Sequence, residues 1–366
     1  MRIALLTYST KPRGGVVHTL ALGEALARAG HDVTVWALAR GGDTGFFRAV
    51  SADVDVRLVP VPDVEGEGVG ERILRSIALL ARGFSGSFDV VHAQDCLTAN
   101  AVGRVRGYGA LWRTVHHLDV FTTPELAACH ERALVEPAGL VCVSEAVAGE
   151  VRAGWGRAPA VIGNGVDAAR FAAAAEAGAG EPWRARYGRY VLAVGGIEPR
   201  KGTLELVEAM ASVDAPLLIA GGDTLFDYRG YRDEVFARAA ALGVEPVVLG
   251  SVDDAGLPGL VAGAAVFAFP STKEGFGLAA MEALAAGVPL VARDLPVLRE
   301  VFAGAARFAD GPEGFAREIR GVLDGSDPEL DPAHATVGRA LAAAHTWDAA
   351  AAAHLALYRR GFTGSD

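Results

Sequence analysis

The sequence predicts an α/β protein of two domains, each with a parallel β-sheet covered by helices on both faces. Short apolar runs of strand length alternate with stretches of helical length along the chain, and this alternation is typical of parallel sheets. The chain has 366 residues, a length that suggests two domains, and 51% of them are hydrophobic, enough for two buried cores. Glycine-rich turns follow several apolar runs, where a strand would pass into a helix.

The elements follow in order along each half. The predicted strands of the first half are residues 2–7, 32–37, 54–61, 89–93, 112–116 and 140–144. The predicted strands of the second half are residues 190–195, 216–220, 246–249, 266–269 and 289–292. Helices are expected over 16–29, which Gly30 ends, and over 203–210. The Ala/Gly-rich segment 172–180 is predicted to be an exposed connection, and residues 340–358 to form one or two helices.

Two Rossmann-like domains follow from this order. We expect an N-terminal domain over residues 1–162 and a C-terminal domain over residues 163–346, with the joint near residues 161–166. In sheets of this kind, ligands bind outside the carboxyl ends of the strands. Two such domains that face each other would hold a ligand in the cleft between them.

Composition excludes several classes of function. A net charge of −10 without a basic stripe argues against a nucleic-acid partner. Three cysteines, Cys96, Cys129 and Cys142, without a C-x-x-C spacing argue against a disulfide framework and a structural zinc site, and fit a reducing cytoplasm. The first apolar run is too short for a signal peptide, and no apolar stretch has the length of a membrane span. Peripheral membrane contact and the oligomeric state stay open.

The strongest motif runs from Pro270 to Leu278 and continues into a helix ending before Pro289. Gly275 and Gly277 let the backbone approach a ligand closely, and the free N–H groups of the helix N-terminus suit a phosphate. Glu274 precedes the helix and Glu282 lies within it. Two carboxylates on either side of a phosphate site could each accept hydrogen bonds from hydroxyl groups, one set on a sugar and the other on a ribose.

A second motif, Val194 to Gly202, also follows a predicted strand and opens a helix. Its adjacent cations, Arg200 and Lys201, could bind a diphosphate and stabilise its charge on leaving without a metal ion.

Two pairs of residues have side chains that could bind a metal ion, but neither pair is suitably placed. His116 and His117 are neighbours at a strand end, so their side chains point to opposite faces and do not suit one shared metal. Asp53 and Asp55 form a D-x-D pair at the start of an apolar strand, without an acidic or histidine partner nearby. We therefore expect neither a metal nor a cofactor.

The string from Glu274 to Glu282 resembles the E-x7-E signature of glycosyltransferase family 4, whose members have the two-domain GT-B fold and retain the anomeric configuration of the sugar. The resemblance implies that Glu274 contacts the donor sugar and Glu282 the ribose. It also implies that a short backbone segment meets the sugar and the distal phosphate: Gly275, Phe276, Gly277 and Leu278.

The same resemblance extends to other loops. Gly196 stands where the family often has an arginine, so the phosphate charges fall to Arg200 and Lys201. Val252 matches the loop beside the nucleobase, and His116 matches a T-x-H element whose histidine lies beside the donor sugar.

Gly14 and Gly15, with His18 in the following helix, resemble the loop that faces the acceptor. Trp347 and Tyr358 resemble the last helix, residues 347–366, which in the family packs back onto the first domain.

The function that follows is a metal-independent retaining glycosyltransferase, with a UDP- or GDP-sugar as donor and a small molecule or glycan as acceptor. The leaving phosphate itself would take the acceptor's proton, so no enzyme nucleophile is required. A nucleotide-sugar epimerase on the same fold and a non-catalytic nucleotide-sugar-binding relative are the alternatives. An NAD oxidoreductase is excluded because neither glycine loop has the G-x-G-x-x-G spacing with an acidic residue about 20 positions on.

Overall fold

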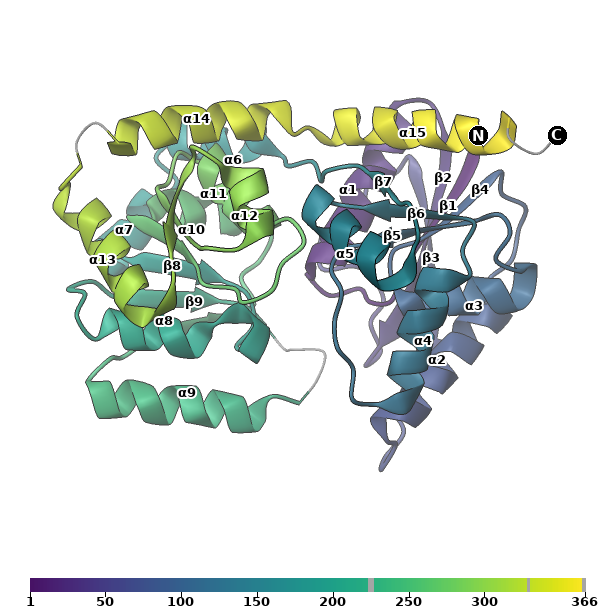
Figure 1. Ribbon diagram of the computed structural model, residues 1–366, viewed down its shortest axis with the longest axis horizontal. Helices are drawn as coiled ribbons and strands as arrows, with labels where there is room; N and C mark the ends of the chain where they lie inside the picture. The colour runs from purple at the N-terminus through teal and green to yellow at the C-terminus, as the bar shows by residue number, and fades with distance from the viewer. Residues whose placement is uncertain (223–226, 328–329, 364–366) are drawn as a thin grey trace. The chain divides into compact units, whose positions relative to one another are not determined.

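The computed structural model describes residues 1–222, 227–327 and 330–363 and divides the chain into two compact units. Unit 1 contains Met1–Gly165 together with the last helix, α15 (Trp347–Thr363), and unit 2 contains Val166–Thr346 (Figure 1). The division falls between Gly165 and Val166, a few residues after the predicted boundary at 162.

Unit 1 is built on a parallel sheet with the strand order β3-β2-β1-β4-β5-β6-β7 within the described residues. Its strands are β1 (Arg2–Thr7), β2 (Asp32–Arg40), β3 (Val54–Val61), β4 (Val90–Ala93), β5 (Leu111–Val115), β6 (Gly139–Cys142) and β7 (Ala160–Val161). Its other helices are α1 (Gly14–Arg28), α2 (Val69–Gly83), α3 (Cys96–Arg106), α4 (Pro124–Val135) and α5 (Glu145–Trp155).

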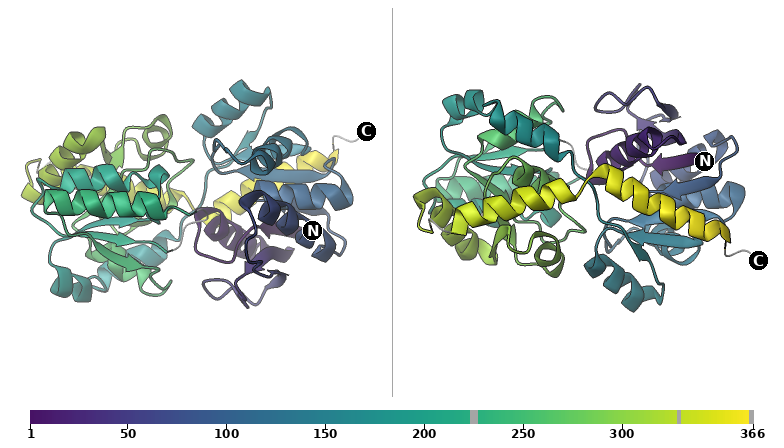
Figure 2. Two further views of the ribbon diagram at one scale, coloured as in Figure 1. Left: turned by 90° about the horizontal axis from the view of Figure 1, so that it is seen from below. Right: turned by 90° about the horizontal axis from the view of Figure 1, so that it is seen from above.

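Burial explains how the helices cover this sheet. β1 and β2 are apolar on both faces and lie inside the sheet, whereas β3 is the edge strand and alternates between buried and exposed residues. Helices α1 and α15 cover one face, and α2, α3 and α4 lie on the other (Figures 1 and 2). Leu355 and Tyr358 of α15 join the apolar core of α1 and β1. The last helix is therefore part of unit 1.

Unit 2 has a second parallel sheet, with the order β10-β9-β8-β11-β12-β13 in the part of the chain that the structure describes. Its strands are β8 (Val191–Val194), β9 (Leu217–Ala220), β10 (Val247–Gly250), β11 (Val266–Phe269), β12 (Leu290–Arg293) and β13 (Ala306–Ala309). Its helices are α6 (Ala168–Glu176), α7 (Glu181–Tyr187), the 3-10 turn η1 (Pro199–Lys201), α8 (Thr203–Met210), α9 (Arg229–Leu242), α10 (Leu257–Gly263), α11 (Leu278–Ala285), α12 (Pro296–Phe302), α13 (Gly311–Asp324) and α14 (Leu330–Ala344).

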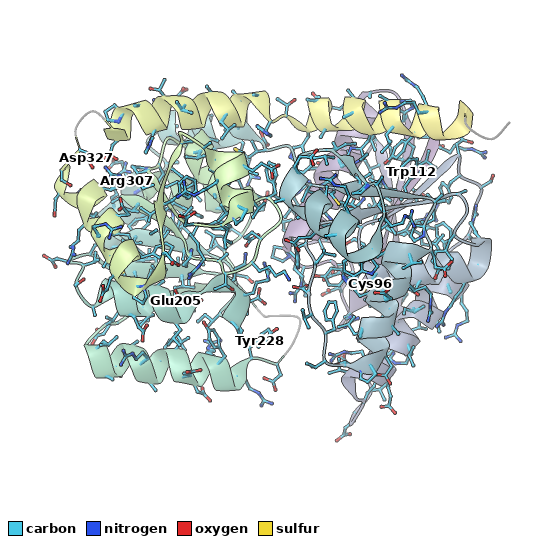
Figure 3. All side chains as sticks on the ribbon, in the orientation of Figure 1. Cys96, Trp112, Glu205, Tyr228, Arg307 and Asp327 are labelled. Atoms are coloured by element: carbon cyan, nitrogen blue, oxygen red, sulfur yellow. The ribbon has the colours of Figure 1, made fainter. Side chains whose placement is uncertain are left out.

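One sequence prediction about unit 2 needs correction, and one strand of unit 2 was missed. The segment 172–180 is not an exposed connection, because α6 covers most of it, begins at the N-cap Asp167 and buries Phe171. Strand β13 was not predicted because Arg307 interrupts its apolar run. That guanidinium is buried and balanced by ion pairs with several carboxylates, among them Asp327 (3.1 Å) and Asp331 (2.8 Å); Figure 3 labels Arg307 and Asp327. In unit 1 the two-residue strand β7 was also missed.

Glycines allow the loops at the carboxyl edge of the second sheet to contact one another closely. Gly202, at the start of α8, has φ +65°, and a Cβ there would overlap the carbonyl oxygen of Pro270 at the end of β11. Gly202 therefore sets how closely the turn after β8 approaches the loop after β11. Of the helices within the described ranges, none has both the length and the hydropathy that crossing a bilayer needs.

We expect Gly202→Ala to lower the stability of unit 2 by roughly 2–5 kcal/mol, because a left-handed backbone and overpacking add up. Gly325→Ala is the matched control, since Gly325 has φ +63° but open space where a Cβ would be. It should cost only about 1 kcal/mol. Calorimetric unfolding of both variants checks the difference, and equal losses would contradict this account of the Gly202 contact.

Candidate active site

Three of the predicted residues in unit 2 meet in one ion-pair network. Arg200 and Lys201 belong to the turn η1 after β8, and Glu274 belongs to the loop between β11 and α11. Lys201 Nζ lies 2.6 Å from Glu274 Oε1, and Arg200 Nη1 lies 3.4 Å from the same oxygen. Arg200 also donates to Glu198 Oε1 at 2.7 Å. The Glu274 side chain is only 11% exposed, so two cations share a largely desolvated carboxylate.

Backbone contacts hold these two loops together. The Thr272 amide donates to the Arg200 carbonyl oxygen (2.8 Å), which joins the loop of Glu274 to the turn of the cations. Beneath them, the buried Arg293 at the end of β12 donates to the Pro270 carbonyl oxygen (2.8 Å) and pairs with Glu205 of α8 (2.7 Å); Figure 3 labels Glu205. Arg293 was not singled out in the sequence, because an arginine at a strand end has no distinguishing pattern.

Lys201 also forms part of a pocket wall. Its aliphatic chain packs against Gly195, and its ammonium lies 5.5 Å from the centre of the Phe269 ring. The pocket opens beside it at the carboxyl ends of β8 and β11. It is lined by Ala193, Val194, Gly195, Lys201, Thr203, Leu206, Ile219, Ala268, Phe269, Pro270 and Ser271.

The N-terminus of α11 has the backbone that the sequence predicted. Gly277 is its N-cap with φ +101°, and a glycine has no side chain that could cap the first turn. Gly275 and Gly277 are buried, and Leu278 is half-buried. Phe276 is buried and its ring lies 5.7 Å from that of His345, so its side chain serves packing and only its backbone faces the loop. First-turn N–H groups without a capping side chain suit a phosphate.

Glu282 has a different environment from Glu274. It lies in the second turn of α11, where burial raises the pKa of its carboxyl group to about 8. Arg170 opposes this rise in the pKa, whereas Asp254 and Asp167 add to it. Asp254 belongs to the loop after β10, which also carries the half-buried Val252. The two predicted nucleoside contacts therefore belong to neighbouring parts of unit 2.

A glycine pair that the sequence analysis missed completes this edge. Gly221 and Gly222 follow β9, and a Cβ at Gly221 would overlap the backbone of Gly195 and Gly196. A Cβ at Gly222 would overlap the Ser251 hydroxyl. The missed signal was a Gly-Gly pair directly after a predicted strand. Gly196 itself is half-buried beside this contact.

In unit 1 the structure brings together His116, Gly15 and His18. A Cβ at Gly15 would lie 3.4 Å from His116 Cδ2, and the rings of His18 and His116 are 4.8 Å apart between centroids, edge to face. Gly14 begins α1, with open space where a Cβ would lie. His18 is buried and hydrogen-bonded through Nδ1 to Asn164 Oδ1 (2.9 Å), so it lies behind His116 and not at the surface, as an acceptor contact would require.

The imidazole of His116 is neutral. Burial lowers its pKa to about 3, and the neighbouring His117, Arg113 and His92 lower the pKa further. His117 instead pairs with Asp119 (2.9 Å between Nε2 and Oδ2), so the two adjacent histidines have separate surroundings.

A buried polar network that the sequence analysis did not anticipate lies behind this group. His92 bridges the Tyr358 hydroxyl (2.6 Å) and Thr114 Oγ1 (2.8 Å), and the His354 ring lies 5.6 Å from that of His92. It joins α15 to β4 and β5. His354 and Tyr358 lie in an alanine-rich tail whose composition indicates only a helix.

The residues that the sequence offered as possible metal ligands do not form a metal site within the described residues. Asp55 lies near the start of β3 and pairs with Arg57 (2.7 Å), and Asp53 is exposed beside it. All three cysteines are free and buried. Among the described residues, no group of three or more His, Cys, Asp or Glu side chains could hold a metal ion.

Known proteins resemble this chain over its whole length. Residues 12–170 match the family model described as Glycosyltransferase Family 4, and residues 185–334 match that of Glycosyl transferases group 1. A phosphatidyl-myo-inositol mannosyltransferase of Mycolicibacterium smegmatis is 31% identical, over 95% of this chain and 90% of the relative. An MMP α-(1→4)-mannosyltransferase of Mycolicibacterium hassiacum is 28% identical, over 93% of this chain and 89% of the relative.

Solved structures show the same fold. Sucrose-phosphate synthase from Thermosynechococcus elongatus superposes with a TM-score of 0.80 at 23% identity and full coverage of both chains. The lipopolysaccharide glycosyltransferase WaaG gives a TM-score of 0.74 at 17% identity, covering 96% of this chain and 98% of that one. The predicted GT-B fold is confirmed, and the chain belongs to glycosyltransferase family 4.

Proposed function

We propose that this glycosyltransferase moves a sugar from a nucleoside diphosphate to an acceptor with retention of anomeric configuration and without a metal ion or a cofactor. The observation that carries the proposal is the pair of cations, Lys201 and Arg200, held around Glu274. The uncapped first turn of α11 begins at the end of the same loop. Charges held in this way stabilise a leaving diphosphate because they need no rearrangement during the reaction.

Each donor group has a matching part of unit 2. The diphosphate takes Lys201, Arg200 and the N–H groups of residues 275–278, and it shares the two cations with Glu274. Glu274 accepts hydrogen bonds from hydroxyls of the donor sugar. Glu282 accepts from the ribose, and Val252 lies against the base.

The unit 1 residues fit a step in which the enzyme supplies no base. A histidine whose pKa is about 3 is a weak proton acceptor, so the proton of the acceptor hydroxyl passes to an oxygen of the leaving phosphate. The new glycosidic bond then forms on the face that the diphosphate leaves. His116 acts as a neutral hydrogen-bonding partner of the donor sugar, and Gly14 and Gly15 leave room for the acceptor.

Mannose is the first donor sugar to test, since relatives that match most of this chain are named mannosyltransferases. The panel should hold UDP-, GDP- and ADP-sugars, with a mannosyl donor among them, and thermal shift should report binding. A donor at a hundred times its dissociation constant stabilises the folded protein against unfolding by about 2.7 kcal/mol.

We place the reaction in the cytoplasm because three free, buried thiols fit a reducing compartment.

Lys201→Ala should lower kcat by roughly 10²- to 10³-fold while donor affinity falls much less, because charge on the diphosphate grows in the transition state. Arg238→Ala removes an exposed ion pair with Glu208 in the same unit and should leave kcat unchanged. Steady-state kinetics with 5′-diphosphate release as readout measure both variants. Inhibition of the wild type by EDTA, reversed by Mg²⁺ or Mn²⁺, would assign this charge to a metal and refute the role of Lys201.

Donor binding should strengthen as pH rises toward 8. The ribose requires the ionised carboxylate of Glu282, whose pKa in the free protein is raised to about 8, so below that pH binding must first remove a proton. Affinity should rise by up to about tenfold per pH unit and level off above the pKa. Glu282→Gln should bind the donor roughly 10-fold or more weakly, with a flat pH profile. Calorimetry between pH 6.5 and 9 with an intact nucleotide-sugar, whose phosphates do not titrate there, checks this; an unchanged profile in Glu282→Gln would remove the residue from the site.

A further inference from the structure

Four arginines gather at the carboxyl edge of the unit 1 sheet, around the end of β2. Arg40 is the last residue of β2, and Arg13 is the N-cap of α1, after the loop that follows β1. Arg72 and Arg75 lie in the first two turns of α2. This edge is where a doubly wound sheet places its ligands, and the concentration of positive charge contrasts with the net charge of −10 of the whole chain.

The guanidinium of Arg40 has few partners. Its only side-chain hydrogen bond within the described residues goes to Ser76 Oγ of α2 (3.1 Å), and its Nε is buried without an acceptor. A guanidinium carries five N–H donors, and leaving them unmet in a desolvated place is costly. Burial lowers the pKa of Arg40, and repulsion by Arg72, Arg13 and Arg75 lowers it too, with Tyr8 opposing. Arg40 therefore carries a positive charge that forms no ion pair within the described residues.

Arg72 adds a second cation of the same kind. It lies four residues before Ser76 on α2, so both residues share the helix face that meets Arg40. Arg72 is half-buried, and its side chain has no hydrogen bond or ion pair within the described part of the chain. The nearby carboxylate of Glu67 is engaged by Arg75, at 2.7 Å from its Nη2. Glu67 thus forms its ion pair with Arg75. Its charge also attracts Arg72 and Arg40, but neither of these forms an ion pair of its own within the described residues.

We propose that Arg40 and Arg72, with Arg13 beside them, form a subsite for a phosphate group carried by the acceptor. A planar guanidinium group can bind two phosphate oxygens at once, and a phosphate dianion would give Arg40 and Arg72 the direct ion pairs that they do not form within the described residues. The proposal rests on the proposed function, in which unit 1 holds the acceptor. The phosphate belongs to a soluble phosphorylated acceptor or to the headgroup of a phospholipid, and the experiment separates these sources.

The test uses the full chain with the donor site filled by a saturating nucleoside diphosphate. Calorimetry measures binding of glycerol 3-phosphate, and sedimentation measures binding to vesicles of phosphatidylcholine with or without phosphatidylinositol. Arg40→Gln and Arg72→Gln should each weaken phosphate binding by roughly 10- to 100-fold. Arg104→Gln, an exposed arginine on α3, is the control with the same loss of charge and should bind as the wild type does.

The binding of glycerol 3-phosphate and of vesicles distinguishes the two sources of the phosphate. Loss of glycerol 3-phosphate binding alone in Arg40→Gln assigns the subsite to a soluble acceptor, and an additional loss of vesicle binding assigns it to a lipid headgroup. Wild-type protein that binds neither ligand, or variants that weaken binding no more than Arg104→Gln does, overturns the subsite. Arg72→Gln, which leaves the hydrogen bond from Arg40 to Ser76 in place, decides the matter if Arg40→Gln does not fold. Failure of the nucleoside diphosphate to bind would instead count against the proposed function.

Discussion

The ion pair between Lys201 and Glu274 is the contact on which the arrangement of the donor side depends, because it joins two loops that leave different strands. Its geometry follows from the backbone beneath it. Gly202 allows the turn after β8 to touch Pro270, and the Thr272 amide then reaches the Arg200 carbonyl. Arg293 closes the same contact from below. Cations held by backbone contacts lose little conformational freedom on meeting a diphosphate, and this is the condition under which fixed charges stabilise a transition state.

The two units carry functional groups of different charge. Unit 2 offers two cations around Glu274 and a second carboxyl group, Glu282, whose pKa is raised by burial. Unit 1 offers a neutral imidazole, His116, in front of a buried network, and an arginine cluster at the carboxyl end of β2. In the proposed mechanism the leaving phosphate takes the proton of the acceptor, so no side chain of either unit has to serve as the base.

The sequence predicted the elements whose signal is local. The bounds of β1, β3, β11 and α8 agree with prediction because an apolar run between turn residues needs no distant partner. The contact of Arg200 and Lys201 with Glu274 could also have been predicted, since the carboxyl ends of parallel strands lie at one edge of the sheet. Arg293, the Gly221 contact and the link from Tyr358 to His92 were not, because each depends on a partner far along the chain. The elevated pKa of Glu282 depends on burial, which helical position alone does not reveal. Strand β13 was hidden by Arg307, whose charge is balanced only in the folded chain.

The central claim is that Lys201, Arg200 and the first turn of α11 hold the diphosphate by themselves. A crystal structure of the full chain with a nucleoside diphosphate, grown in the presence of EDTA, tests it most directly. The account predicts the distal phosphate within hydrogen-bonding distance of Lys201 Nζ and of backbone N–H groups among residues 275–278, with Glu274 still beside the cation. A diphosphate that lies away from Lys201, or one that binds only when a divalent cation is supplied, would contradict it.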